Sequence, residues 1–112
     1  MATFNKVLLL GFLGHDPELK NTINGNPFCR LNLATHEFHK NNEGESEKKT
    51  VWHSVHVFGK QAEWACSSLQ KGSRLFVEAV LEKSDLADKE SGKIKSQQFL
   101  KARQVSGLSP SA

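Results

Sequence analysis

The chain has 112 residues, of which 38% are hydrophobic and 24% charged, a composition typical of one soluble globular domain. Its net charge of +3 and sequence pI near 9.0 are compatible with a polyanionic partner but do not demand one. The longest apolar run, Val7–Leu10, is too short to span a bilayer, and "MATFNK" lacks the apolar segment of a signal peptide. We therefore expect a cytoplasmic protein. The alternative is a mitochondrial matrix protein whose presequence has been removed.

The first half of the chain has the pattern of β-strands separated by polar turns. A first strand is predicted at about Asn5–Leu13, and it ends at the turn residues around Pro17. Asn24-Gly25 is a hairpin signal, and a second strand follows at about Phe28–Phe38. Every second residue of that strand is expected to face the core: Cys29, Leu31, Leu33 and Thr35. The stretch His39–Lys49 is polar without periodicity and indicates an exposed loop.

The third predicted strand, "TVWHSVHVFGK" at Thr50–Lys60, has two different faces. A period of two places Val55 and Val57 on one face together with His53. The opposite face carries two large aromatic side chains with small polar residues between them: Trp52, Ser54, His56 and Phe58. Such a face either packs against another part of the protein or holds a ligand, and the strand alone leaves both interpretations open.

A helix is predicted after Gly59, because the apolar residues change to a helical period over about Gln61–Gln70. The residues of its apolar face are Ala62, Ala65, Cys66 and Leu69. Gly72 is the expected left-handed C-cap, and Lys71 lies at the negative end of the helix dipole. Two cysteines without a paired spacing indicate free buried thiols rather than a disulfide framework.

The last third of the chain predicts two further strands and a tail. The fourth strand is expected at about Arg74–Glu82, followed by a polar loop at Lys83–Gly92 and a weaker strand at about Ile94–Val105. We expect one domain over residues 1–106 and a short flexible tail over residues 107–112. Five strands with a helix between the third and fourth predict an all-β fold, the five-stranded Greek-key barrel known as the OB-fold.

Catalytic and metal-binding motifs are weak in this sequence. The pairs His36/His39 and His53/His56 lie in strand sequence, where residues three apart face opposite ways, and no Cys-x-x-Cys accompanies them. No nucleophile motif or phosphate-binding loop is present, and most of the 12 carboxylates fall in polar loops. We therefore predict no metal, no cofactor and no enzymatic activity.

Four segments in order resemble the bacterial-type single-stranded DNA-binding protein: "NKVLLLGFLGHDPELK", "LNLATHE", "VWHSVHVFGKQAE" and "LQKGSRLFVEA". The resemblance extends over about Asn5–Val105. It implies an OB-fold that assembles as a homotetramer, in preference to a dimer, and binds single-stranded DNA without sequence specificity during replication, recombination and repair. It also implies that His53 lies at a subunit contact.

The resemblance and the strand pattern together give a set of candidate DNA-binding residues. Trp52 and Phe58 match two base-stacking aromatic residues of the family, and Ser54 and His56 lie between them. Phe38 and His39 lie where the family has another stacking tryptophan. Cations near the DNA phosphates are expected from six positions: Lys6, Lys48, Lys49, Lys60, Lys71 and Arg74.

Three departures from the family pattern weaken this expectation. A further tryptophan is replaced at about Leu86, and the basic run before it becomes Glu82–Asp85. The acidic tail with which the family recruits replication and repair proteins is absent from this sequence. We therefore expect weaker and more salt-sensitive DNA binding, as in a truncated core, a mobile-element version or a paralogue. Two alternatives are a dimer similar to primosomal replication protein N, and an OB module that binds proteins and little DNA.

Overall fold

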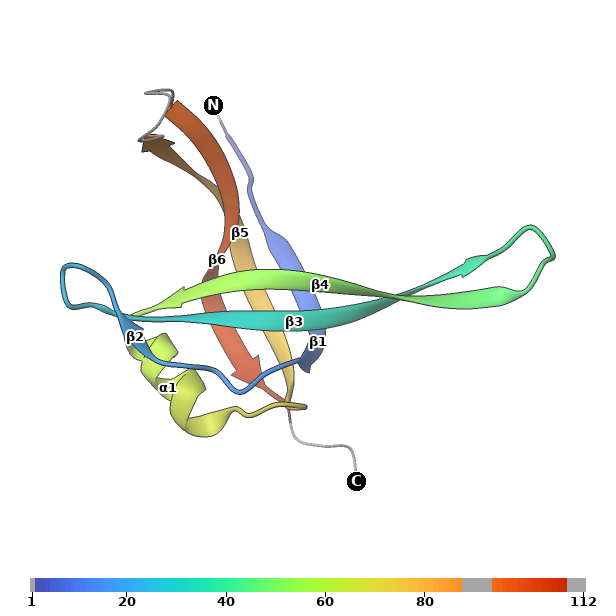
Figure 1. Ribbon diagram of the computed structural model, residues 1–112, viewed down its shortest axis with the longest axis horizontal. Coiled ribbons are helices and arrows are strands. Elements are labelled where there is room, and N and C mark those ends of the chain that lie inside the picture. Colours follow the sequence, from blue (N-terminus) through green and yellow to red (C-terminus); the bar gives the residue numbers. More distant parts are fainter. Residues whose placement is uncertain (1, 88–93, 109–112) are drawn as a thin grey trace.

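The computed structural model describes residues 2–87 and 94–108. Six strands and one helix are present in the order β1 (Val7–Leu13), β2 (Lys20–Asn21), β3 (Pro27–Lys40), β4 (Ser46–Phe58), α1 (Lys60–Ser68), β5 (Arg74–Ala87) and β6 (Ile94–Gly107). Figure 1 shows the strands crossing one another in two layers, with α1 packed at one end. In the described part of the chain, no helix has the length and hydropathy needed to cross a membrane.

Five of the strands close into a barrel. The neighbours follow the order β1-β5-β6-β4-β3, and β3 returns to β1 through the pairs Phe12–Ala34 and Leu13–Leu33. All barrel pairings are antiparallel except β4–β6, which is parallel. The helix lies between the third and fourth barrel strands, so the predicted OB-fold is confirmed. The two-residue strand β2, which was not predicted, adds to β3 outside the barrel.

The barrel interior is filled by alternate residues of its strands, including the predicted core residues Cys29, Leu31 and Leu33 of β3. The largest fully buried side chains are aliphatic residues and one cysteine from β3, β4 and β5: Leu31, Leu33, Leu75, Val55, Val57, Val77 and Cys29. Ala62 and Ala65 of α1 are also buried, which confirms the apolar face of the helix. Both cysteines are free, and burial together with the neighbouring Cys66 raises the pKa of the Cys29 thiol to about 12.

The predicted loop at His39–Lys49 is wrong, because β3 and β4 continue through most of it as a long two-stranded arm. Only a short turn separates Lys40 from Ser46, and the side chain of Asn41 accepts hydrogen bonds from the N–H groups of Glu43 and Glu45 at 2.9 and 3.0 Å. Figure 1 shows this arm projecting well beyond the barrel. Both of its faces meet water, so its strands lack the apolar alternation by which a strand is recognised.

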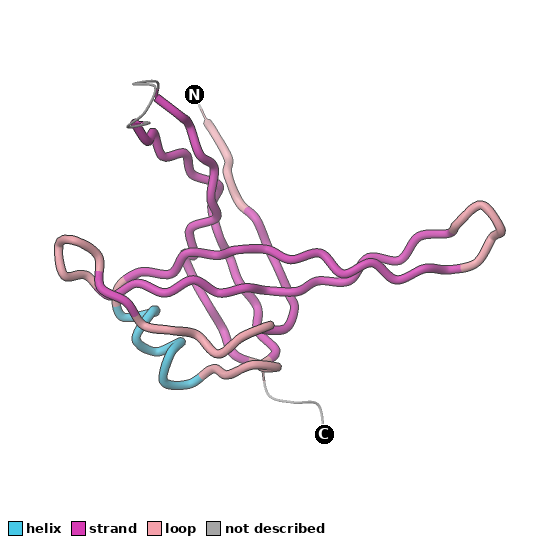
Figure 2. Tube along the Cα trace, in the orientation of Figure 1, coloured by secondary structure: helices cyan, strands magenta, loops and turns pink. Residues whose placement is uncertain are grey.

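The predicted loop at Lys83–Gly92 is also wrong in its first part, which is strand. Strand β5 continues to Ala87, paired with β6 as far as Ile94, and residues 88–93 lie outside the described part. The tube view in Figure 2 shows β5 and β6 leaving the barrel as a second arm. At its other end β6 runs to Gly107, and the N–H of Leu108 donates to the carbonyl of Arg74 at 2.9 Å. The strand thus extends into the stretch where the tail was expected.

The helix ends earlier than predicted, and Gly72 is not its C-cap. The helix stops at Ser68, and its C-cap is Leu69 in an extended conformation, which buries its side chain. Gly72 has a φ of 90° in the turn that leads to β5. Its N–H donates to the carbonyl of Leu13 at 2.8 Å, so this turn is fixed to the end of β1.

Candidate nucleic-acid interface

One side of β3 and β4 carries the aromatic residues singled out in the sequence, and we call it the ribbon face. Directly paired residues of an antiparallel ribbon point to the same side. The cross-strand pairs of the ribbon face are Phe28–Phe58, Arg30–His56, Asn32–Ser54, Ala34–Trp52, His36–Thr50 and Phe38–Lys48. Val55 and Val57 point the other way into the core, which confirms the predicted alternation along β4.

Phe58 and His56 belong to an aromatic cluster at one end of the ribbon face. The rings of Phe28 and Phe58 have centroids 5.0 Å apart, and His56 stacks on Phe99 of β6 at 4.9 Å. The ammonium of Lys101 lies 5.7 Å from the centroid of the Phe58 ring, within the range of a cation–π contact. This cluster combines exposed ring surface with a cation, the two features that a stacked and negatively charged ligand requires.

Trp52 is the most exposed tryptophan and lies at the middle of the ribbon face. It is 58% exposed. The other tryptophan, Trp64 of α1, is 40% exposed and lies near Gly107 of β6. The indole lies directly over Gly14, because a Cβ built there would sit 2.4 Å from the Trp52 Cζ3 atom. The ring is thus supported from below by backbone while its other side faces solvent.

The environment of His56 lowers the pKa of its imidazole and so favours the neutral form. Burial lowers its pKa below the usual 6.5, and the guanidinium of Arg30, its partner across the ribbon, lowers it further. The imidazole stacks on Phe99, and Arg30 and Lys101 are the permanent cations beside it. A phosphate placed beside both groups would favour the protonated imidazole.

The four candidate DNA-binding residues of the projecting arm lie on two different sides of it. Phe38 and Lys48 form a cross-strand pair on the ribbon face, and Phe38 is 71% exposed. His39 and Lys49 belong to the alternate pairs and point to the opposite side. His39 lies 3.4 Å from the Glu47 carboxylate, which is its cross-strand partner.

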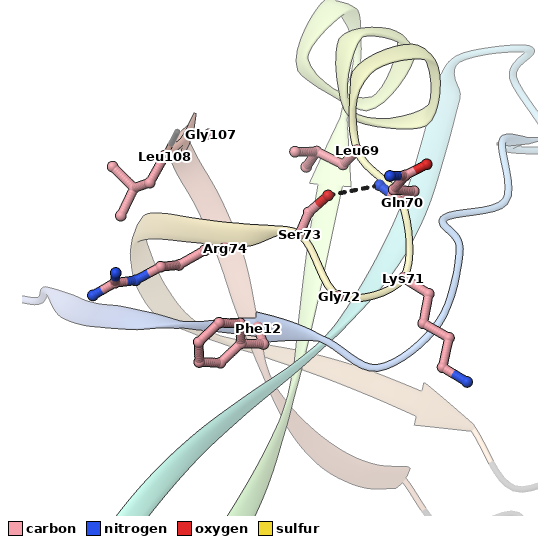
Figure 3. A pocket seen from close by; sticks show the side chains of 9 residues that line it. All are labelled: Phe12, Leu69, Gln70, Lys71, Gly72, Ser73, Arg74, Gly107 and Leu108. Atoms are coloured by element: carbon pink, nitrogen blue, oxygen red, sulfur yellow. Dashed lines mark hydrogen bonds between the residues drawn. The ribbon is translucent and has the colours of Figure 1, made fainter. Parts of the chain in front are cut away.

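The remaining predicted cations lie outside the ribbon face. Lys6 precedes β1, and its ammonium is paired with Glu78 at 3.2 Å. Lys60 is the first residue of α1 and is exposed. Lys71 and Arg74 lie at opposite ends of a pocket where the turn before β5 meets the end of β1 (Figure 3).

His53 and the departures from the family pattern occupy other parts of the barrel. His53 lies on the core side of β4, where its Nε2 and the Thr35 hydroxyl are 2.9 Å apart in a partly buried hydrogen bond. Glu82 lies 3.9 Å from the ammonium of Lys101, so one of the acidic residues reaches the cation near Phe58. Leu86 is opposite Lys95 in the β5–β6 arm, and its side chain lies outside the described part.

Several residues of the ribbon face were not predicted. Phe28, Arg30 and Asn32 alternate with the predicted core residues of β3, so the period of two could have placed them on the face opposite the core. Phe99 and Lys101 reach the cluster only because β6 pairs with β4 in parallel at Val55–Leu100 and His56–Lys101, which no local pattern indicates. Among the described residues, no three His, Cys, Asp or Glu side chains are grouped as metal ligands would be.

The fold and the ribbon face define an OB-fold protein with exposed aromatic and cationic residues along one ribbon, and comparison with known proteins agrees. The model of the single-strand binding protein family matches residues 4–108. The chain is 46% identical over 77 residues to the single-stranded DNA-binding protein of Xanthomonas campestris pv. campestris, covering 69% of this chain and 45% of that protein. It is 39% identical over 94 residues to single-stranded DNA-binding protein 1 of Xylella fastidiosa, covering 83% of this chain and 69% of that protein. The chain belongs to the single-strand binding protein family.

Solved structures give the same result for the fold. The single-stranded DNA-binding protein from Thermus aquaticus, as a deletion mutant, superposes with a TM-score of 0.80 at 31% identity, covering 95% of this chain and 51% of that chain. The Plasmodium falciparum protein, solved in complex with single-stranded DNA, superposes with a TM-score of 0.79 over 97% of this chain and 98% of that chain. Its sequence identity of 24% supports the fold alone. The chain spans less than half the length of the Xanthomonas relative.

Proposed function

We propose that this protein binds and protects single-stranded DNA without sequence preference, during replication, recombination and repair, and that it is not an enzyme. The observation that carries the proposal is Trp52, an indole exposed on one side, supported on the other by Gly14, and aligned on the ribbon face with Phe58. Every base offers a π-face, so stacking on such rings is tolerant of sequence and contributes about 1–3 kcal/mol per base. Arg30, Lys48 and Lys101 supply cations for the phosphates.

The DNA path that we propose follows the ribbon face from Phe58 past Trp52 to Phe38. The candidates on this path are Trp52, Phe58, Phe38, Ser54, His56 and Lys48, together with Phe28, Arg30 and Lys101. The cations outside the ribbon face, Lys60, Lys71 and Arg74, extend the positive surface beyond it. Lys6 is less favourably placed, because it is paired with Glu78. His39 and Lys49 are less favourable as well, since both point to the other side of the arm and are paired across it with glutamates.

The direct test is a fluorescence titration with oligothymidylate in a Trp64→Phe variant, so that the signal comes from Trp52 alone. We expect quenching that is strong at low salt and weaker at high salt. Oligodeoxyadenylate should quench as well if binding is independent of sequence. The Trp52→Ala variant should lose about 1–3 kcal/mol of binding free energy. An absence of quenching at low salt would rule out the stacking role of Trp52.

We also propose that the chain assembles as a homo-oligomer, a tetramer in preference to a dimer. Strand β1 supports this, because on the side away from β5 it pairs with β3 only at Phe12 and Leu13, among the described residues. Its Leu8 and Leu10 side chains are also exposed. His53 is the proposed contact residue, and native mass spectrometry of wild type and His53→Ala tests this. A dimer with weaker DNA binding would favour the primosomal alternative. An oligomer whose Trp52 does not respond to DNA would favour the protein-interaction module.

A further inference from the structure

Phe12 is an exposed aromatic residue that the proposed DNA path does not yet use. It lies near the end of β1 and is 43% exposed. Its neighbours on the same side of β1 are Leu8 and Leu10. The three side chains differ in what lies across from them on β5: Glu78 faces Leu8, Phe76 faces Leu10, and Arg74 faces Phe12. Phe12 alone combines an exposed ring with a cation.

A row of paired residues connects Phe12 to Trp52. Phe12 of β1 pairs with Ala34 of β3, and Ala34 pairs with Trp52 of β4. Directly paired residues point to the same side of a sheet, so Phe12 and Trp52 flank Ala34 on the ribbon-face side. Two strand spacings, about 10 Å, separate the two backbones. The row is Arg74–Phe12–Ala34–Trp52, and it crosses four strands.

The side chains close most of the distance along this row. Trp52 extends toward β1, since its ring lies over Gly14, which directly follows the last residue of the strand. His36, two residues beyond Ala34, approaches from the arm, and its ring centroid lies 6.4 Å from that of Phe12. Ala34 is therefore a small residue enclosed by three rings. The rings of Trp52, His36 and Phe12 thus lead from the ribbon face onto β1.

A pocket of about 540 Å³ lies on the far side of Phe12. Figure 3 shows Phe12 and Arg74 on neighbouring strands, with Lys71 on the turn that ends at Ser73. None of the described residues that line this pocket is acidic. One carboxylate lies behind the turn, where Asp16 Oδ1 accepts a hydrogen bond from the Lys71 N–H at 2.7 Å. That bond, and the one from the Gln70 N–H to the Ser73 hydroxyl at 2.9 Å, fix the turn and hold Lys71 at the pocket.

We propose that this pocket is a nucleotide subsite in which a base stacks on Phe12 while Arg74 and Lys71 contact the adjacent phosphates. The inference rests on the proposed function and extends the DNA path from Trp52 across Ala34 onto β1 and β5. The ligand is a segment of the same single strand, because the subsite is continuous with the ribbon face and its charge is positive. Arg74 is suited to the site, since its planar guanidinium can hold a phosphate through two hydrogen bonds.

The first test is photo-cross-linking of the unmodified protein to an oligonucleotide that contains 5-iododeoxyuridine. Trypsin separates Val7–Lys20, which carries Phe12, from Thr50–Lys60, which carries Trp52 and Phe58. We expect cross-links in both peptides, with the first localised to Phe12 by fragment masses. Cross-links confined to Thr50–Lys60 would overturn the subsite and leave the proposed function intact. An absence of both binding and cross-links would contradict the proposed function itself.

The second test compares Phe12→Ala with Ile23→Ala, which removes an exposed apolar side chain from the turn between β2 and β3, outside both β1 and the ribbon face. Phe12→Ala should weaken oligothymidylate binding about 5- to 150-fold, the effect of losing one stacked base. Ile23→Ala should leave binding unchanged. Equal affinities for the two variants would overturn the proposal. So would a change in native mass confined to Phe12→Ala, because Phe12 would then be covered by a second copy of the chain.

Discussion

At the scale of single residues, Gly14 determines where the Trp52 ring can lie. A methyl group added there would meet Cζ3 and Cη2 of the indole at 2.4 and 2.6 Å, closer than real Cβ contacts. Gly14→Ala should therefore displace the ring from its present position and weaken oligonucleotide binding, by no more than the loss caused by Trp52→Ala. Fluorescence anisotropy of a labelled oligonucleotide measures this.

The control for Gly14→Ala is the double variant Gly14→Ala/Trp52→Ala. If Gly14 acts only through the position of the ring, this variant should bind DNA no more weakly than Trp52→Ala alone. If Gly14→Ala bound like the wild type, the position of the ring over Gly14 would be irrelevant to binding.

His56 should give both stability and DNA binding a pH dependence. Its pKa in the folded protein lies below the usual 6.5, so between these two values the unfolded chain binds more protons than the folded one. The free energy of unfolding should therefore rise with pH through this window and level off above about pH 6.5. Urea denaturation at a series of pH values measures the effect, and His56→Gln should reduce the slope.

DNA binding should show the opposite trend, because a phosphate beside His56 would raise the pKa of the imidazole. Affinity is then expected to increase as the pH falls through the pKa of the imidazole in the complex, more in the wild type than in His56→Gln. Identical pH profiles for the two proteins would mean that no phosphate approaches His56.

The residues of the ribbon face show what alternation can predict. A period of two placed Trp52, Ser54, His56 and Phe58 on one side because Val55 and Val57 require the other. The same alternation could have predicted Phe28 and Arg30, which alternate with core residues of β3. It could not have predicted that Phe99 lies beside His56, because the parallel pairing of β4 with β6 joins strands that are remote in the chain.

At the scale of elements, the two arms are the part of the fold that sequence patterns missed. A strand is recognised by apolar residues on the side that faces a core, and the arms project beyond the barrel and have no core side (Figure 1). Their stability comes instead from backbone pairing and from turn chemistry such as the Asn41 hydrogen bonds and the positive φ of Gly44. The barrel strands, in contrast, were found within a few residues.

The β3–β4 arm should contribute to DNA binding without contributing to stability. Phe38 is 71% exposed and has little packing to lose, so Phe38→Ala should change the free energy of unfolding by less than about 0.5 kcal/mol. If the DNA path includes the arm, the same variant should lose binding free energy on the scale of one stacked base, about 1–3 kcal/mol. Urea denaturation and oligonucleotide titration separate the two effects. If the affinity of Phe38→Ala were unchanged, the DNA would not contact Phe38 on the arm.

At the scale of the whole molecule, the distribution of charge should determine how strongly the DNA affinity depends on salt concentration. The net charge is only +3, but cations gather along the ribbon face and at the pocket beside Phe12, while Glu82 lies near Lys101. Because a stacking tryptophan of the family pattern is replaced here at about Leu86, we expect a larger share of the affinity to come from the release of counterions. Binding should therefore be weaker and more salt-dependent than is usual for the family.

A variant of Lys48 tests the expected salt dependence through the slope of the binding constant against salt concentration. For single strands, the logarithm of the binding constant falls with the logarithm of the salt concentration by about 0.7 for each phosphate neutralised. Lys48 pairs with Phe38 on the ribbon face, so Lys48→Gln should reduce the steepness by about 0.7. Lys49 points to the opposite side of the same arm, and Lys49→Gln changes the net charge equally. Oligothymidylate titrations over a series of salt concentrations compare the two variants. A smaller effect for Lys49→Gln would place the phosphates along the ribbon face, whereas equal effects would mean that DNA follows the net charge of the arm and not this face.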